Sequence, residues 1–112
     1  MTFTNFAEIM VIYNTQARRD LANILKGLIS WKKHPLEYVH ALQYVDDITD
    51  ACDNLDDRTY HFDATYDEHL QYGDKVFTYK RNPHTTWYVI YDVDNYRNVY
   101  INKIVSNYLT KS

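Results

Sequence analysis

The side chains that could do chemistry in this chain are cations and aromatic rings in its C-terminal third. Residues 75–112 carry six basic side chains against two acidic ones, whereas residues 1–74 carry six basic and thirteen acidic ones, so the overall charge of −3 hides a basic segment. Cations can hold phosphates and aromatic rings can stack on bases, so this mix is compatible with nucleic-acid contact. The residues concerned are Lys80, Arg81, Arg97 and Lys103, with Asn107 and Tyr108 just beyond.

The same residues also have a simpler interpretation. Aromatic residues are common in strands, so Trp87 and Tyr91 can be core residues. Four extra positive charges are a modest patch on a chain with a pI of about 5.9. Composition alone therefore favours a structural role for the aromatic rings and a solvated surface for the cations.

Other chemistries are disfavoured by the residue types present. Gly27 and Gly73 are the only glycines and neither begins a phosphate-binding loop, so nucleotide-driven chemistry is not expected. Cys52 is the single cysteine, which excludes an intramolecular disulfide, and its apolar neighbours predict core packing rather than a nucleophile. No cofactor or metal is expected, because the histidines show no paired ligand spacing and are predicted at surface or turn positions. They are His34, His40, His61, His69 and His84.

Length and composition predict one globular domain spanning residues 1–112. Hydrophobic residues make up 46% of the chain and aromatic residues 16%, which is enough apolar surface for one core. No apolar stretch approaches the roughly 20 residues of a membrane span, and the N-terminus lacks the basic region of a signal peptide. The expected location is the cytoplasm.

The first half of the chain predicts a strand and a helical hairpin. Residues 9–13 form a continuous apolar run, typical of a strand covered on both faces, and Asn14 or Thr15 can cap the helix that follows. Pro35 predicts the first turn of a second helix that folds back on the first. Apolar residues recur at threes and fours in both: Ala17, Leu21, Ile24, Leu25 and Leu28, then Tyr38, Leu42, Val45, Ile48, Cys52 and Leu55.

Acidic residues gather on the outer face of the second helix. A helix radiates its side chains, whereas the ligands of a hard cation must converge, so a solvated face is favoured over a metal site. The residues are Asp46, Asp47, Asp50, Asp53, Asp56 and Asp57.

The second half of the chain predicts strands. Residues 76–81 and 86–91 flank a turn at 82–85, where Pro83 cannot sit in a central strand, and residues 99–105 form a last strand after a turn at 92–98. Residues 59–65 alternate weakly and could be a further strand, and 66–74 are expected to be a loop. The predicted fold class is α+β: an N-terminal strand, a two-helix hairpin, then a mostly antiparallel sheet of three or four strands.

Several of these segments resemble the RelE/ParE superfamily of small bacterial toxins. Residues 11–28 resemble its opening strand and first helix, with the pattern A-x-x-D-L-x-x-I at Ala17, Asp20, Leu21 and Ile24. Residues 46–55, 79–91 and 99–104 are similar to its second helix and closing strands. The resemblance covers roughly residues 9–109; residues 1–8 look like an extension, and Met10 is an alternative initiator.

The resemblance implies the toxin of a type II toxin–antitoxin pair, which an antitoxin neutralises by direct binding in a hetero-oligomer. RelE-like members cleave messenger RNA in the ribosome, and in this chain their basic and aromatic positions would be matched by Lys80, Arg81, Arg97, Lys103 and Tyr108. ParE-like members inhibit DNA gyrase and need no such set. Some nucleases end in His-Tyr where this chain has Asn107-Tyr108, and this departure, with the low pI, favours a ParE-like binding toxin. A third hypothesis, beside the two kinds of toxin, is a non-toxic interaction module of the same fold.

Overall fold

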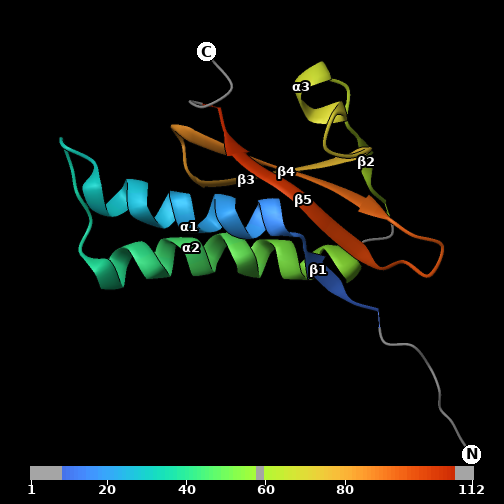
Figure 1. The fold of residues 1–112 in the computed structure, drawn as a ribbon, viewed down its shortest axis with the longest axis horizontal. Helices are drawn as coiled ribbons and strands as arrows, with labels where there is room; N and C mark the ends of the chain where they lie inside the picture. The colour runs from blue at the N-terminus through green and yellow to red at the C-terminus, as the bar shows by residue number, and fades with distance from the viewer. Residues whose placement is uncertain (1–8, 58–59, 108–112) are drawn as a thin grey trace, which may run out of the picture.

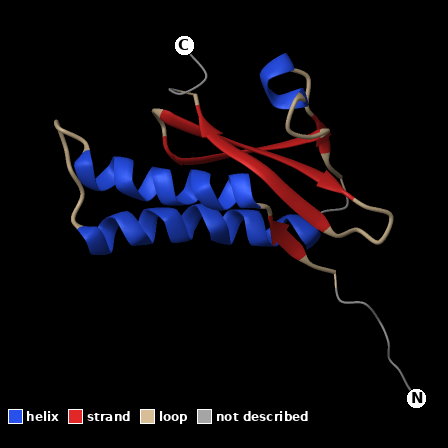
Figure 2. Cartoon of the chain, in the orientation of Figure 1, coloured by secondary structure: helices blue, strands red, loops and turns tan. Residues whose placement is uncertain are grey.

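The computed structural model describes residues 9–57 and 60–107, which fold as an α+β unit. Figures 1 and 2 show a twisted sheet with two long antiparallel helices on one face and a short helix on the other side. The sheet has five strands in the order β1-β5-β4-β3-β2, and its pairings are antiparallel except that β1 runs parallel to β5. The predicted fold class is confirmed.

β1 (Val11–Tyr13) is shorter and more exposed than predicted. It lies at the edge of the sheet and pairs with β5 alone, so its three residues are only half-buried and the expectation of a strand covered on both faces is wrong. Asn14 then caps α1 (Thr15–Ser30) as predicted, because its Oδ1 accepts a hydrogen bond from the Ala17 N–H at 2.9 Å.

α2 (Tyr38–Asp53) begins three residues after Pro35, so the predicted start is wrong. The Leu36 N–H donates to the Leu28 carbonyl at 3.0 Å, which ties this segment to the end of α1 before the second helix can begin. Tyr38 is 60% exposed, and Ala41 and Tyr44 take the buried positions of the first turns. A 3₁₀ turn, η1 (Asn54–Asp57), continues the helix. The predicted core positions Ile48, Cys52 and Leu55 are fully buried.

The three long strands are β3 (Lys75–Asn82), β4 (Thr85–Val93) and β5 (Val99–Ser106). The predicted hairpin between β3 and β4 is confirmed, with Asn82 Oδ1 accepting hydrogen bonds from the backbone N–H groups of His84 and Thr85. On the inner face, towards the helices, β4 contributes Trp87, Val89 and Tyr91 to the core, as predicted for the two aromatic residues.

The segment between η1 and β3 differs most from expectation. The possible strand at residues 59–65 is confirmed in part by the two-residue strand β2 (Phe62–Asp63), the fifth strand of the sheet, but a one-turn helix, α3 (Asp67–Leu70), stands where a loop was predicted. His69 of α3 is 3% exposed, so its predicted surface position is wrong. A four-residue helix is too short to show the periodicity on which helix prediction depends. No helix within the described part of the chain is long and apolar enough to span a membrane.

Candidate functional site

A groove of about 1110 Å³ opens between the sheet and the end of the helical hairpin where α1 connects to α2. α1 and the segment before α2 supply one wall, the β3–β4 hairpin supplies the other, and the end of β5 lies between them. Most of the lining is apolar, and its polar side chains include two of the predicted cations, Arg81 and Lys103. The apolar side chains of the groove include Ile24, Leu28, Trp31, Leu36, Trp87 and Ile104.

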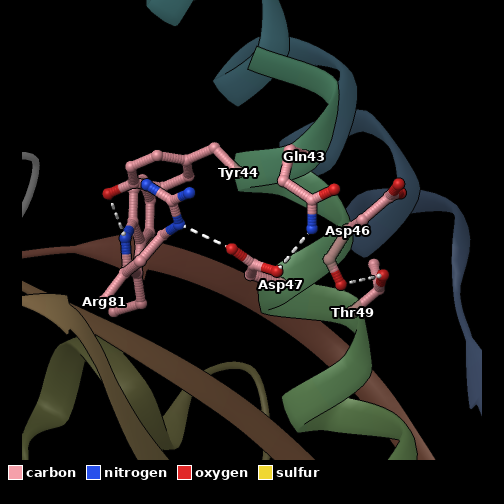
Figure 3. Close-up of polar contacts among 7 residues, drawn as sticks. Gln43, Tyr44, Asp46, Asp47, Thr49 and Arg81 are labelled. Carbon is pink, nitrogen blue, oxygen red and sulfur yellow. Dashed lines mark hydrogen bonds and ion pairs between the residues drawn. The ribbon is translucent and has the colours of Figure 1, made fainter. Parts of the chain in front are cut away.

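Arg81 is held at the mouth of the groove by residues of α2 (Figure 3). Its Nε donates to Asp47 Oδ2 at 2.7 Å, and its guanidinium carbon lies 4.5 Å from the centre of the Tyr44 ring. The Tyr44 hydroxyl in turn accepts a hydrogen bond from Trp87 Nε1 at 3.0 Å, and both rings are buried. These contacts fix the guanidinium through its Nε side.

The two terminal amino groups of Arg81 remain available for a ligand. Neither donates a hydrogen bond to a residue in the described ranges 9–57 and 60–107. Paired N–H groups of an arginine match the two oxygens of a carboxylate or phosphate. Arg81 is therefore a pre-positioned anion contact beside an apolar groove.

Asp47 is fixed from two sides. Gln43 Nε2 donates to its Oδ1 at 2.8 Å while Arg81 holds Oδ2. The hydrogen bond from Arg81, and secondarily that from Gln43, lowers the pKa of Asp47 below its ordinary value. The ion pair therefore contributes stability above that ordinary value and loses it as the pH falls through the lowered pKa.

Replacing Arg81 with glutamine should raise the pKa of Asp47 back towards its ordinary value, because the largest cause of the shift is removed. The titration of the Asp47 carboxyl carbon, followed by NMR in the wild type and in Arg81→Gln, measures this directly. The matched control is Arg97→Gln, which removes a guanidinium from the turn before β5 and should leave Asp47 unchanged. An Asp47 titration that is identical in wild type and Arg81→Gln would show that the pair does not form in solution.

Lys103 is paired with Asp20 of α1 across the edge of the sheet. Lys103 Nζ lies 3.1 Å from Asp20 Oδ1, and Asp20 Oδ2 accepts the Ile104 N–H at 2.9 Å. The hydrogen-bonded ladder between β1 and β5 ends at Tyr13 and Ile101. Beyond that point β5 is an edge strand, and Asp20 accepts the Ile104 N–H that would otherwise be unpaired there. Asp20 is 7% exposed, which makes it a buried structural carboxylate.

The structural role of Asp20 as a buried partner of β5 was not predicted, although its position on α1 indicated that it would be buried. Asp20 lies three residues after Ala17 and four before Ile24, so it falls on the buried stripe of α1. An acidic residue on an apolar stripe needs a buried partner, and that partner comes from a strand far away in the chain.

The other predicted site residues do not join this groove. Lys80 precedes Arg81 on β3 at an irregular part of its pairing with β4; it is exposed and does not line the groove. Arg97 lies in the turn between β4 and β5 with a positive φ of 70°, and its Nη2 lies 3.4 Å from the Asp56 carbonyl oxygen. Figure 1 places this turn at the opposite end of the sheet. Tyr108 is outside the described residues.

Two of the acids of α2 hold neighbouring side chains. Asp47 pairs with Arg81, and Asp53 accepts a hydrogen bond from the Tyr13 hydroxyl at 2.6 Å. In the part of the chain that the structure describes, no three histidine, cysteine, aspartate or glutamate side chains are grouped so that they could hold a metal ion.

No protein-family model matches the chain, and no match was found among the curated proteins or the solved structures.

Proposed function

We propose that this chain is the toxin of a type II toxin–antitoxin pair and acts in the cytoplasm as a ParE-like growth inhibitor. It would bind its target rather than cleave it, DNA gyrase being the target that the resemblance implies. Support comes from the resemblance of residues 9–109 and from the element order, in which a strand and two helices precede the antiparallel strands.

The observation that carries this choice is the pairing of the two groove cations with carboxylates. A ribonuclease must stabilise a phosphate whose negative charge grows in the transition state, which calls for cations converging on one point. Here Asp47 and Asp20 partly neutralise Arg81 and Lys103, while Lys80 and Arg97 do not line the groove. This arrangement suits recognition by contact better than phosphate chemistry.

The groove is also the surface on which an antitoxin segment would dock. An amphipathic helix can lay apolar side chains on Leu28, Leu36 and Trp87 and place a carboxylate on the two terminal amino groups of Arg81. Trp31, at the rim and 55% exposed, is the apolar residue that such a segment would cover most.

The test compares growth, gyrase supercoiling and cleavage of ribosome-bound mRNA for the wild type and three variants. We expect wild-type induction to stop growth and to inhibit supercoiling without cutting mRNA. Arg81→Ala should weaken gyrase inhibition by no more than roughly fivefold, as a partly exposed contact does. Lys103→Ala should do the same to inhibition, but it should also lower stability because buried Asp20 loses its counter-charge, so its inhibition is compared per folded protein. Tyr108→Phe should change neither assay.

Two results would contradict the proposal, each in favour of a different function. Codon-specific mRNA cleavage that Arg81→Ala abolishes, with gyrase untouched, would establish a RelE-like endonuclease; such a loss should be about a hundredfold or more. Silence in both assays with normal growth would favour a non-toxic interaction module of the same fold.

A further inference from the structure

Residues 64–74, which we name the α3 strap, lie over the outer face of the sheet, away from α1 and α2 (Figure 1). The base of the strap is closed by the Ala64 N–H, which donates to the Asp74 carbonyl at 2.8 Å. Two contacts then attach it to the sheet: Asn102 Nδ2 donates to the Tyr72 carbonyl at 2.7 Å, and the Asp74 N–H donates to Asp92 Oδ1 at 2.9 Å. All of these contacts lie towards one end of the strap.

The other end of the strap is held by His69. Its ring lies between the rings of Tyr66, at 5.3 Å, and Tyr88 of β4, at 5.0 Å. The residue is 3% exposed, and its Nδ1 is buried without a hydrogen-bond partner among the described residues. A neutral imidazole fits this position, whereas an imidazolium would bury a charge and an N–H donor that has no acceptor.

The groups that face His69 do not compensate for that charge. Burial lowers the pKa of His69, and the neighbouring Glu68 on α3 opposes this only in part. From β4 the facing group is the Tyr88 ring, and Tyr66 faces it from the start of α3. The other charges on this side lie at the base of the strap: Asp92 of β4 accepts the Asp74 N–H and Asn102 Nδ2, and Lys103 of β5, paired with Asp20, has its Nζ 5.3 Å from the centre of the Tyr72 ring.

We propose that the α3 strap is a pH-sensitive latch, held on the sheet by neutral His69 and released when His69 takes a proton. Release would uncover Tyr88 and Ile90 of β4 beside Lys103, and so expose aromatic, apolar and cationic groups on the outer face. The latch would operate whatever partner the groove takes.

The direction of the pH dependence follows from the difference between the pKa of His69 in the closed strap and in the open strap. An exposed histidine has a pKa of about 6.5, and the closed strap lowers it. The closed state is therefore fully favoured above about pH 6.5 and loses its advantage as the pH falls towards the lowered value. Each pH unit between the two pKa values corresponds to a tenfold change in the ratio of closed to open strap.

The experiment follows amide hydrogen exchange and the titration of His69 by NMR in the full chain. The reporters are Leu70, Tyr72 and Gly73, whose N–H groups donate within the strap. After correction for the intrinsic exchange rate, their protection should fall about fivefold or more between about pH 7.5 and about pH 5.5, a range in which histidine is the side chain that titrates. Protection of Val89 and Ile101 in the core should not change.

His69→Phe keeps a ring between Tyr66 and Tyr88 but cannot take a proton, so its strap should stay protected at both pH values. The matched control is His40→Phe, the same change at an exposed histidine of α2, which should keep the wild-type response. Acid-dependent loss of protection in His69→Phe would overturn the latch, as would strap protection in the wild type that does not vary with pH. If His69→Phe does not fold, the wild-type titration decides: a His69 pKa at or above about 6.5 overturns the proposal, and one below it supports it.

Discussion

Asp20→Ala is expected to lower the free energy of unfolding by about 3 kcal/mol or more, the cost of breaking a buried charge pair by removing one partner. The change leaves the Ile104 N–H without its acceptor and Lys103 without its counter-charge. Both losses fall on the edge of β5, where β1 no longer covers it. Urea unfolding followed by fluorescence and circular dichroism measures the effect.

Two further variants show which part of Asp20 matters. Asp20→Asn keeps a side-chain oxygen that can accept the Ile104 N–H but carries no charge, so it should cost about half as much. Asp50→Ala removes an exposed acid from α2 and should change stability by no more than about 0.5 kcal/mol. If Asp20→Ala were no more costly than Asp50→Ala, Asp20 would not be the residue that closes this edge.

Tyr44→Ala is expected to cost about 4 kcal/mol, which is typical of an aromatic residue removed from a core. Tyr44 is 7% exposed, packs edge-to-face on Trp87 at 6.1 Å between ring centres, and accepts the indole N–H. The variant also removes the ring beneath the Arg81 guanidinium. In Tyr44→Ala, the free energy of unfolding and the pKa of Asp47 should therefore both change.

The hydrogen bond can be separated from the packing. Tyr44→Phe keeps the ring and leaves only the Trp87 N–H unpaired, so it should cost about 1–2 kcal/mol. Tyr38→Ala, a matched change on the same helix at a residue that is 60% exposed, should cost no more than about 0.5 kcal/mol. A Tyr44→Phe variant as unstable as Tyr44→Ala would mean that the ring contributes nothing beyond its hydroxyl.

The parts of the fold that the sequence predicted correctly are those with local signals. Asn14 could be predicted as a helix cap because the N–H group that it accepts from belongs to Ala17, only three residues along the chain. The turn at Pro83 could be predicted because proline has a fixed φ and no N–H to donate to a sheet. Ile48, Cys52 and Leu55 followed from helical spacing. α3 and the burial of His69 could not be read in this way, since they depend on docking against Tyr88, a residue of another element.

The candidate site was predictable only in part. Lys80 and Arg81 were grouped with Arg97 and Lys103 as basic residues of the C-terminal strands and turns, yet of these four only Arg81 and Lys103 line the groove. The pairing of Arg81 with Asp47, and of Lys103 with Asp20, joins helices to strands far along the chain. Such partners become visible only when the topology is known.

The parallel pairing of β1 with β5 sets the order of events when the protein is made. Val11 has no neighbour in the sheet until Val99 has been synthesised, and Asp20 has no backbone N–H to accept from β5 until Ile104 has followed. Closing so long a loop is slow compared with forming the helices. The helical hairpin can therefore form before β5 is translated, and until then its apolar face has no sheet to pack against. The groove, and any activity that depends on it, comes into existence only after β5 has joined the sheet.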